Sequence, residues 1–537
     1  MKTKQKPGRR QWLAVWAAVA LLAALSIFLR AGAGDRKLYI NEDATWHVLH
    51  TMDSYDGIPA AEHLCLPLVT ENDDARGIVW GATVPDKDGL FYYTSFWPLG
   101  FLAPYLFANI TGLPHLPGTL FAFNAVLYVA GAVLLALAMA RLFRDRLNPA
   151  LATFCAAGLY LFQPEILQSQ GWVYWHHGLN QVLLLAQFYC FACFDKRVGK
   201  IGFFVLCLLT PLAEYTGFVA NAGYCLALVC LGPPQFWGMR GTRKKASFAK
   251  SRLLPALGAG LLTVAAGAGT LWHYTRKLPF KQVWRAMFQS YEARGDAEQG
   301  PLLQLAVMYF RSFRWLWLIL ALLAVAVLVL PGARRALPGV FKACWKWLLL
   351  AVFPLLENLI LRQHTMEYSY ARMKGILPLA VLFLMLAACL WQAESFKRTG
   401  DKKPNWQRAV AGALAALTLL GGAAGLAQYL AVPNRYVEVI DYKDENAALA
   451  AQVLAAYPRD ESFYGFNLPT RGYTNHLWAG GVMELCKAED TLAEAQARGK
   501  AYAVQLAGEW ATSNTYRFTG AVVYDAQSGA VLAEFFA

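Results

Sequence analysis

The sequence predicts a mainly α-helical, polytopic membrane protein that ends in a small α/β domain. Of its 537 residues, 57% are hydrophobic and 16% are charged, whereas soluble domains carry about 25% charged residues. The charge is unevenly placed: residues 1–432 hold 41 Lys and Arg against 22 Asp and Glu, and residues 433–537 hold 8 against 13. We therefore predict a basic transmembrane body over 1–432 and an acidic extracytoplasmic domain over 433–537. A cytosolic enzyme and a disordered protein are excluded by the same composition.

Eleven apolar runs are long enough, or nearly so, to cross a membrane, which takes about 20 helical residues. They lie near 11–30, 118–140, 150–164, 178–194, 200–213, 216–232, 253–272, 313–331, 345–361, 374–393 and 409–431. Basic clusters lie at 2–10, 141–146, 196–200, 240–252, 334–346 and 397–408. Because basic loops stay in the cytoplasm, eleven crossings place the N-terminus inside and the C-terminal domain outside. We expect a multi-pass protein of the bacterial inner (cytoplasmic) membrane.

The apolar stretch 95–111 is a further candidate, but a full crossing there would place Arg141 to Arg146 on the wrong side. We interpret it as a re-entrant or interfacial segment, which is permitted where the backbone lines a protein cavity. A true span, compensated by a missed or merged crossing elsewhere, is the alternative. The predicted number of spans is therefore about 11–13.

This orientation collects the unusual polar residues on the outer side. The first outer loop, 31–94, holds eleven Asp and Glu against four Lys and Arg, and short outer connections follow at 165–177, 213–216, 273–312 and 357–373. The ionisable residues there are Glu42, Asp43, Glu165, His176, His177, Glu214, Glu357, His364, Glu367 and Arg372. Such groups are costly at a membrane surface unless they serve a cavity. Together they predict an extracytoplasmic functional site.

Glu42 and Asp43 follow the first span directly. Adjacent carboxylates there can supply a general base and a hydrogen-bonding or metal-binding partner beside a lipid headgroup. A solvated helix start is the alternative, since Asn41 is a good N-cap and acidic residues suit the positive end of a helix dipole.

Three patches of sequence carry a resemblance to a known family. They are the acidic pair, the segment Tyr92-Tyr93-Thr94-Ser95-Phe96-Trp97-Pro98, and Glu357-Asn358-Leu359 through His364, Tyr368 and Tyr370. In this order, over residues 10–400, the chain resembles the polytopic glycosyltransferases of the GT-C superfamily. The resemblance is to family 39-like enzymes, akin to protein mannosyltransferases and lipid A aminoarabinose transferases.

The resemblance implies transfer of a sugar from a polyprenyl-phosphate-linked donor to a lipid, glycan or protein acceptor. It also implies a carboxylate base after the first helix, which we assign to Asp43, with Glu42 as its neighbour. Two departures stand out: the order of the acidic pair is reversed, and Phe96-Trp97-Pro98 replaces the family's basic-Pro-Pro element. Whether the sugar is a hexose or a pentose is not identified.

The remaining polar residues are candidates for substrate binding. Arg372 and Lys374 suit the departing phosphate, or are snorkelling anchors at a helix end. An aromatic-imidazole cluster with His176 and His177 follows Glu165 and suits sugar recognition, or forms part of an interfacial belt. The other candidates are Tyr92, Tyr93, Glu214, His364 and Glu367. Because the side chains of adjacent histidines rarely bind the same ion, we expect no metal site at His176 and His177. A divalent cation as cofactor is the alternative.

The segment 273–312 is amphipathic, and we predict either an interfacial helix that gates the site or a plain connector. In the C-terminal region we predict strands at 436–440, 461–466 and 501–506, helices at 444–458 and 491–499, and a hairpin of 515–525 with 530–537. No phosphate loop or nucleophile motif lies there, so an accessory role is expected. Nothing indicates nucleic-acid binding, since the tail is acidic and the basic residues flank spans.

A transporter or flippase for a lipid-linked or sugar substrate is the main alternative function, because it also needs a polar cavity among many spans. Transporters commonly show internal repeats and charges at mid-membrane. This chain instead concentrates its polar groups at one surface. A sensor or scaffold is a third, weaker alternative.

Overall fold

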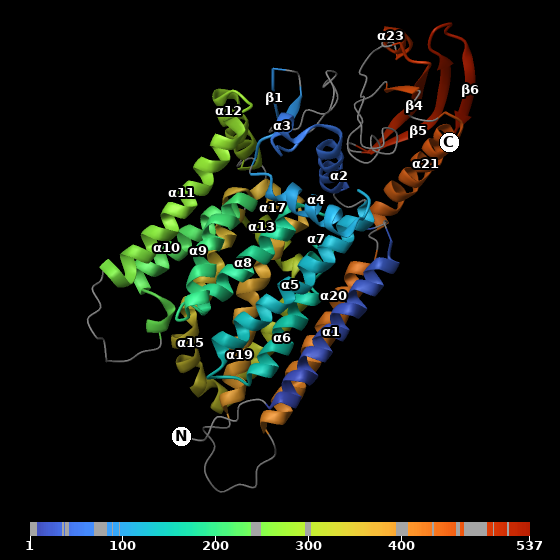
Figure 1. Ribbon diagram of the computed structural model, residues 1–537. Coiled ribbons are helices and arrows are strands. Elements are labelled where there is room, and N and C mark those ends of the chain that lie inside the picture. The colour runs from blue at the N-terminus through green and yellow to red at the C-terminus, as the bar shows by residue number, and fades with distance from the viewer. Residues whose placement is uncertain are drawn as a thin grey trace.

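The structure is a computed structural model that describes residues 8–34, 37, 42–68, 83–87, 90–95, 97–237, 249–295, 302–393, 406–431, 434–457, 462–466, 491–497, 499–512 and 515–537. Most of these residues form a tall helical bundle, and a small sheet stands beyond one end of it (Figure 1).

All eleven predicted apolar runs fall on helices. The long helices of the bundle are α1 (Arg9–Gly32), α5 (Pro117–Phe143), α6 (Pro149–Leu161), α8 (His176–Ala192), α9 (Arg197–Ala213), α10 (Thr216–Leu231), α11 (Leu254–Thr275), α14 (Arg314–Val329), α15 (Pro331–Val352), α19 (Ile376–Gln392) and α20 (Trp406–Leu430). Within the described residues, six helices are long and apolar enough to span a membrane. The number is seven if the bent pair Leu302–Ser312 and Arg314–Val329 forms a single span. The polytopic helical fold is confirmed.

The predicted run 345–361 is the second half of a longer unit. Helix α15 begins at Pro331, and the short helices η5 (Phe353–Leu355) and α16 (Leu356–Ile360) continue it. Proline also opens α5, α6 and the short helix α7 (Pro164–Ser169), where its fixed φ suits the first helical turn and its missing N–H costs nothing.

Short elements crowd one end of the bundle, where the outer connections were predicted (Figure 1). They are α2 (Glu42–Gly57), α3 (Ala60–His63), β1 (Thr83–Pro85), β2 (Phe91–Tyr93), α4 (Leu99–Thr111), α7 (Pro164–Ser169), α12 (Phe280–Gly295), α13 (Leu302–Ser312), α17 (Arg362–Glu367), α18 (Ser369–Arg372) and η6 (Met373–Gly375). Strands β1 and β2 form an antiparallel hairpin. The opposite end carries the start of α1 and the short helices η2 (Pro234–Phe236) and η3 (Ala249–Leu253).

Two of these elements explain the irregular apolar segments. Helix α4, in the stretch 95–111, has 13 residues and is about 20 Å long at 1.5 Å per residue, which is shorter than the bilayer's apolar core. Helices α13 and α14 meet at an angle of 86°. Helices α12 and α13 and the end of α11 cover most of the segment 273–312. Helix α13 is bent sharply away from α14, which follows it.

A buried cation joins three segments at this end of the bundle. Arg30, on the last turn of α1, donates from Nη1 to the carbonyl of Gln170 at 2.7 Å and to that of Leu167 at 3.3 Å. Its guanidinium also lies 4.1 Å from the ring centroid of Tyr128 on α5. A cation near a helix C-terminus is favoured by the helix dipole, and here it also fixes α7 against α1 and α5.

The C-terminal region begins with α21 (Asn434–Ala456), followed by β3 (Ser462–Phe466), α23 (Thr491–Ala497), β4 (Tyr502–Thr512), β5 (Thr515–Asp525) and β6 (Val531–Phe536). The sheet has the order β3-β4-β5-β6, with β3 parallel to β4 and the other pairs antiparallel. The hairpin is confirmed. The strand predicted at 436–440 is wrong, because these residues continue into the helix predicted at 444–458 and form one helix, α21.

Candidate active site

Eight polar residues meet inside the end of the bundle that carries the C-terminal domain. We call them the polar cluster: His176, His177, Asn180, Glu214, Thr216, Glu357, His364 and Lys374. They come from α8, the α9–α10 junction, α16, α17 and η6, and all are at most 8% exposed.

Glu214 lies at the break between helices α9 and α10. Pro211 lies in the last turn of α9, and the backbone of Glu214 is extended, with φ −174° and ψ 156°. Glu214 Oε2 accepts the Thr216 backbone N–H at 3.1 Å. It thereby caps α10, where negative charge is stabilised by the unsatisfied N–H groups of the first turn.

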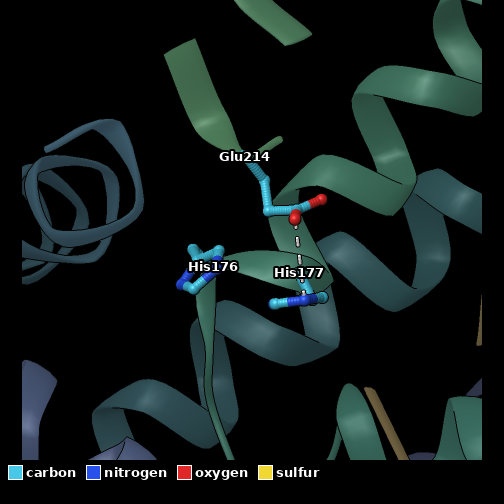
Figure 2. Close-up of side chains that lie close together, drawn as sticks. All are labelled: His176, His177 and Glu214. Atoms are coloured by element: carbon cyan, nitrogen blue, oxygen red, sulfur yellow. Dashed lines mark ion pairs between the residues drawn. The ribbon is translucent and has the colours of Figure 1, made fainter. Parts of the chain in front are cut away.

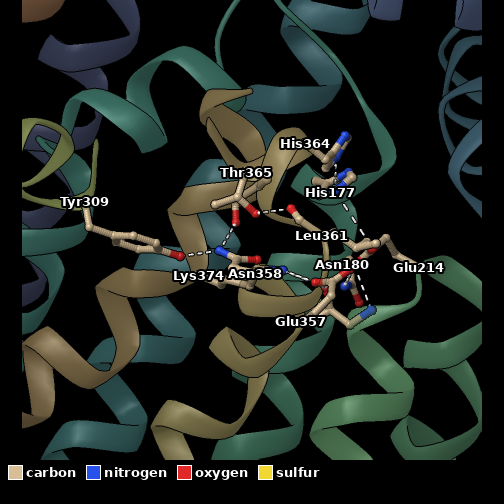
Figure 3. Close-up of polar contacts among 12 residues, drawn as sticks. His177, Asn180, Glu214, Tyr309, Glu357, Asn358, Leu361, His364, Thr365 and Lys374 are labelled. Atoms are coloured by element: carbon tan, nitrogen blue, oxygen red, sulfur yellow. Dashed lines mark hydrogen bonds and ion pairs between the residues drawn. The ribbon is translucent and has the colours of Figure 1, made fainter. Parts of the chain in front are cut away.

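Thr216 connects this carboxylate to a second one. Its hydroxyl contacts Glu214 Oε2 and Glu357 Oε2, so two carboxylates share one donor. Lys374 Nζ donates to Glu357 Oε2 and, at 3.0 Å, to Thr216 Oγ1. Asn180 Nδ2 adds a hydrogen bond to Glu214 Oε2 at 2.9 Å (Figure 3). The result is a continuous buried network from Lys374 to Glu214.

Two imidazoles adjoin Glu214, and a third, that of His364, adjoins His177. His176 and His177 are the first two residues of α8, because the extended backbone of Trp175 ends the preceding segment. His177 Nε2 lies 3.8 Å from Glu214 Oε1 and 3.4 Å from His364 Nε2. Figure 2 shows both neighbouring histidines below the Glu214 carboxylate. The adjacent histidines therefore face one common carboxylate.

Arg372 forms a second ion pair beside the polar cluster. Its guanidinium lies 3.2 Å from Glu165 Oε1 and donates to Ser312 Oγ at 2.9 Å and to the carbonyls of Thr365 and Met366 at 2.7 and 3.0 Å. It thus holds α7, the end of α13 and the segment that carries His364. A guanidinium with so many partners is suited to positioning.

The start of α2 is attached to the segment that precedes His176. Thr45 Oγ1 accepts the backbone N–H of Tyr174 at 2.9 Å. Two residues on, the His47 ring packs 5.1 Å from Tyr93 and 5.6 Å from Trp175, between ring centroids. Burial, and secondarily the charge of His50, lowers the pKa of His47 well below 6.5. This imidazole is therefore neutral near pH 7.

The structure brings some of the predicted site residues together and separates others. Lys374, Glu214, His176, His177 and His364 meet in the polar cluster, and Glu165 and Arg372 pair beside it. Tyr93 packs on Trp175, which precedes His176, whereas Tyr92 points to the other face of β2, where its ring lies 5.5 Å from Lys277 Nζ. Glu367 is exposed and accepts a hydrogen bond from Gln363 at 3.1 Å. The side chains of Glu42 and Asp43 lie outside the described residues, although α2 begins at Glu42.

Asn180 and Thr216 were not predicted as site residues, and Glu357 was predicted on the outer side without an individual role. Asn180 follows His176 by four residues, so both lie on one face of α8, and this spacing is a usable signal. Thr216 follows Glu214 by two, as a capping arrangement allows. The pairing of Glu357 with Lys374 is set by two breaks in the helical path, which no local pattern reveals.

An apolar cavity of about 300 Å³ lies beside the polar cluster. Helices α9 to α12 and the turn at Ser95 form its wall, including Pro211, Tyr215, Phe218, Leu271, Trp284 and Met287. Pro211 and Tyr215 flank Glu214 in sequence. The wall of the cavity therefore includes Tyr215, the residue that directly follows Glu214.

The fold of this chain resembles those of solved structures. ArnT from Cupriavidus metallidurans, solved bound to undecaprenyl phosphate, matches with a TM-score of 0.58 at 13% identity, over 96% of this chain and 99% of that chain. The two chains share one fold. This confirms, for the fold, the resemblance to GT-C-type membrane glycosyltransferases.

The apo oligosaccharyltransferase of Archaeoglobus fulgidus also matches, with a TM-score of 0.49 at 12% identity, over 97% of this chain and 75% of that chain. No protein-family profile and no curated protein sequence matches the chain significantly.

Proposed function

We propose that the protein is a membrane glycosyltransferase that moves a sugar from a polyprenyl-phosphate-linked donor to an acceptor on the extracytoplasmic side. The observation that carries the proposal is the combination of an ArnT-like fold over nearly the whole chain with a buried polar cluster beside an apolar cavity. ArnT was solved with undecaprenyl phosphate bound. An amphiphilic donor of this kind needs both an apolar groove and a polar headgroup site.

The reaction is a single displacement at the anomeric carbon of the sugar. The acceptor hydroxyl loses its proton to a carboxylate as its oxygen forms the new bond to that carbon. The bond from the carbon to the donor phosphate breaks, and its electron pair stays on the phosphate, which leaves as polyprenyl phosphate. We assign the base to Asp43, with Glu42 beside it. The Thr45–Tyr174 hydrogen bond supports this assignment, because it holds the first turn of α2 near the segment leading to His176.

The negative charge that develops on the leaving phosphate needs donors that are already in place. Lys374 is our candidate, because it gives two of its three N–H donors to Glu357 and Thr216 and has one more for a phosphate oxygen. Arg372 is assigned a positioning role, since its contacts hold His364 relative to Glu165. The acceptor, which is a lipid, a glycan or a protein, is bound from the outer side, where the C-terminal domain stands as an accessory unit.

The proposal is tested with purified full-length protein reconstituted with a panel of polyprenyl-phosphate sugars. Transfer is measured as released polyprenyl phosphate. Replacing Asp43→Asn should lower the rate by about 10²–10⁴-fold, which is the usual contribution of a general base. Asp56→Asn is the matched control on the same helix, because Asp56 binds Tyr105 at the far end of α2, and it should retain the wild-type rate.

Two results would overturn the proposal in different ways. Undiminished transfer by the Asp43→Asn protein would reject the assigned base. Movement of intact donor between leaflets without any released polyprenyl phosphate would reject transfer and favour a flippase.

A further inference from the structure

The two adjacent histidines and Glu214 have the arrangement of a metal site. One ligand atom from each of His176, His177 and Glu214 lies within 4.8 Å of the other two. All three side chains are buried, and they lie close together between α8 and the α9–α10 junction (Figure 2). We propose that these residues bind one divalent transition-metal ion of the zinc type.

Small side-chain rotations bring the ligand atoms to the distances of such an ion. Zinc binds imidazole nitrogen at about 2.0–2.1 Å, so neighbouring ligand atoms of a tetrahedral site are about 3.3–3.4 Å apart. His177 Nε2 and Glu214 Oε1 are 3.8 Å apart, and one ring nitrogen of His176 lies within 4.8 Å of a ligand atom of each. The three atoms therefore have to approach one another by up to about 1.5 Å when the ion binds.

The surroundings hold the ligands in place. Asn180 Nδ2, the Thr216 N–H and the Thr216 hydroxyl all contact Glu214 Oε2, which turns Oε1 toward His177. Outer hydrogen bonds of this kind orient the ligands of metal sites. Gly100 packs directly under His176, and a Cβ added at Gly100 would lie 2.3 Å from His176 Cβ. The ring of His176 is therefore set by a position that only glycine tolerates.

The charge of the cluster also favours a bound cation. Glu165 pairs with Arg372, and Glu357 pairs with Lys374. No lysine or arginine among the described residues forms an ion pair with Glu214, which receives neutral donors and faces His177. A buried carboxylate without a counter-charge is costly, and a divalent ion on Glu214 removes that cost. A proton on His177 would give a smaller compensation and is the competing explanation.

The donor set selects the class of metal. Imidazole nitrogen with one carboxylate suits zinc, cobalt and nickel, whereas magnesium and calcium prefer oxygen ligands. The site itself rests on these contacts alone. Its role, to orient or polarise a phosphate or hydroxyl oxygen of the substrates, rests on the proposed function.

Metal content of the full-length protein tests the site. The detergent-solubilised protein is stripped with a chelator, equilibrated with zinc sulfate, desalted and analysed by mass spectrometry of the metal. We expect about one zinc per chain in the wild type and a loss of at least about tenfold in His177→Gln and in Glu214→Gln. His115→Gln is the matched control, because His115 is paired with Asp53, and it should retain the wild-type zinc content.

Cobalt supplies a second readout, since its visible absorption reports ligation directly. The wild type loaded with cobalt should absorb as a protein-ligated ion, the two variants should not, and excess magnesium should leave the spectrum unchanged. Absence of zinc and cobalt from folded, monodisperse wild-type protein would overturn the site whatever the variants do, as would equal zinc content in wild type and both variants. Zinc binding without any sugar transfer would instead reject the proposed function and leave the site standing.

Discussion

The Thr216 hydroxyl joins three charged groups of the polar cluster, because it contacts two carboxylates and one ammonium. Replacing Thr216→Val keeps the shape and removes that hydroxyl. Leaving buried polar partners unsatisfied costs about 1–3 kcal/mol, so we expect a lower melting temperature and a transfer rate reduced about tenfold or more. Thr153→Val is the control, because the buried Thr153 hydroxyl bonds only to the carbonyl of Pro149 among the contacts described, at 2.9 Å. Equal transfer by both variants would contradict this role.

Gly100 is the second residue with a large expected effect. The Ala variant must displace His176, since the new Cβ would lie 2.3 Å from His176 Cβ. We expect Gly100→Ala to lower both the zinc content and the transfer rate by about tenfold, while the protein still folds, because a shift of about 1 Å at a reacting centre is costly. Gly118→Ala, in the first turn of α5, meets nothing within 4 Å and should leave both unchanged. Both quantities are measured on the same purified samples.

At the scale of elements, His115 joins α2 to the connection between α4 and α5. His115 Nδ1 lies 2.8 Å from Asp53 Oδ1, and this hydrogen bond, opposed by burial, raises the pKa of His115 above 6.5. The pair therefore stabilises the fold fully below pH 6.5, and the contribution is lost as the pH rises through the raised pKa.

Thermal unfolding across pH tests this pair. Asp53→Asn should lower the melting temperature near pH 5.5, by an amount equivalent to about 1 kcal/mol, and should have little effect near pH 8.5. The same decrease at both pH values would show that the ion pair is not the cause.

Helix α12 is the element we expect to contact the membrane surface. Phe280, Trp284 and Phe288 recur every four residues and are 55%, 53% and 54% exposed, which is the pattern of an interfacial amphipathic helix. Trp284 also lines the apolar cavity. Trp284→Glu should raise KM for a long-chain polyprenyl donor about tenfold with little change in kcat, because the side chain contributes to binding the chain.

The control for this prediction carries the same charge on the same helix. Gln282→Glu lies on the exposed side away from the aromatic stripe and should leave KM unchanged. A water-soluble, short-chain donor should not distinguish the three proteins. A tenfold rise in KM for that donor as well would assign Trp284 to the headgroup site instead.

The elements were largely predictable because membrane helices are encoded by composition over about 20 residues. Every predicted apolar run lies on a helix, and the hairpin of β5 and β6 follows its turn residues. The failure at 436–440 has a physical cause. Alternation of apolar and polar residues over only five positions is weak evidence for a strand. These five residues instead extend the adjacent helix and form part of α21.

The candidate site was predictable only as a set of residues at one end of the bundle. Ionisable residues are rare at the ends of apolar helices, and this made five of the site residues predictable: His176, His177, Glu214, His364 and Lys374. Their pairing was not predictable, because it depends on where α9 breaks before Thr216 and on how the short helices after α15 fold back. The separation of Tyr92 from Tyr93 follows from strand alternation, but only once β2 is known to exist.

At the scale of the whole molecule, the two ends of the bundle carry different parts of the chain. The start of α1 and the C-terminal domain lie at opposite ends (Figure 1). With the basic loops inside, we expect alkaline phosphatase fused after Ala537 to be active and a green fluorescent protein fused there to be dark, since the first matures only outside the cytoplasm and the second only inside. A fluorescent C-terminal fusion would reverse the orientation and move the polar cluster to the cytoplasmic side.

The position of the 300 Å³ cavity determines how a ligand reaches it. Helix α11 forms one wall and exposes Leu257, Leu261 and Val264 along its length, so we expect a ligand to approach from the lipid phase. A molecule that arrives this way diffuses in two dimensions, and its encounter rate depends on its mole fraction in the bilayer. Diluting such a ligand with inert lipid at constant total amount should therefore slow turnover, whereas diluting the vesicles with buffer should not.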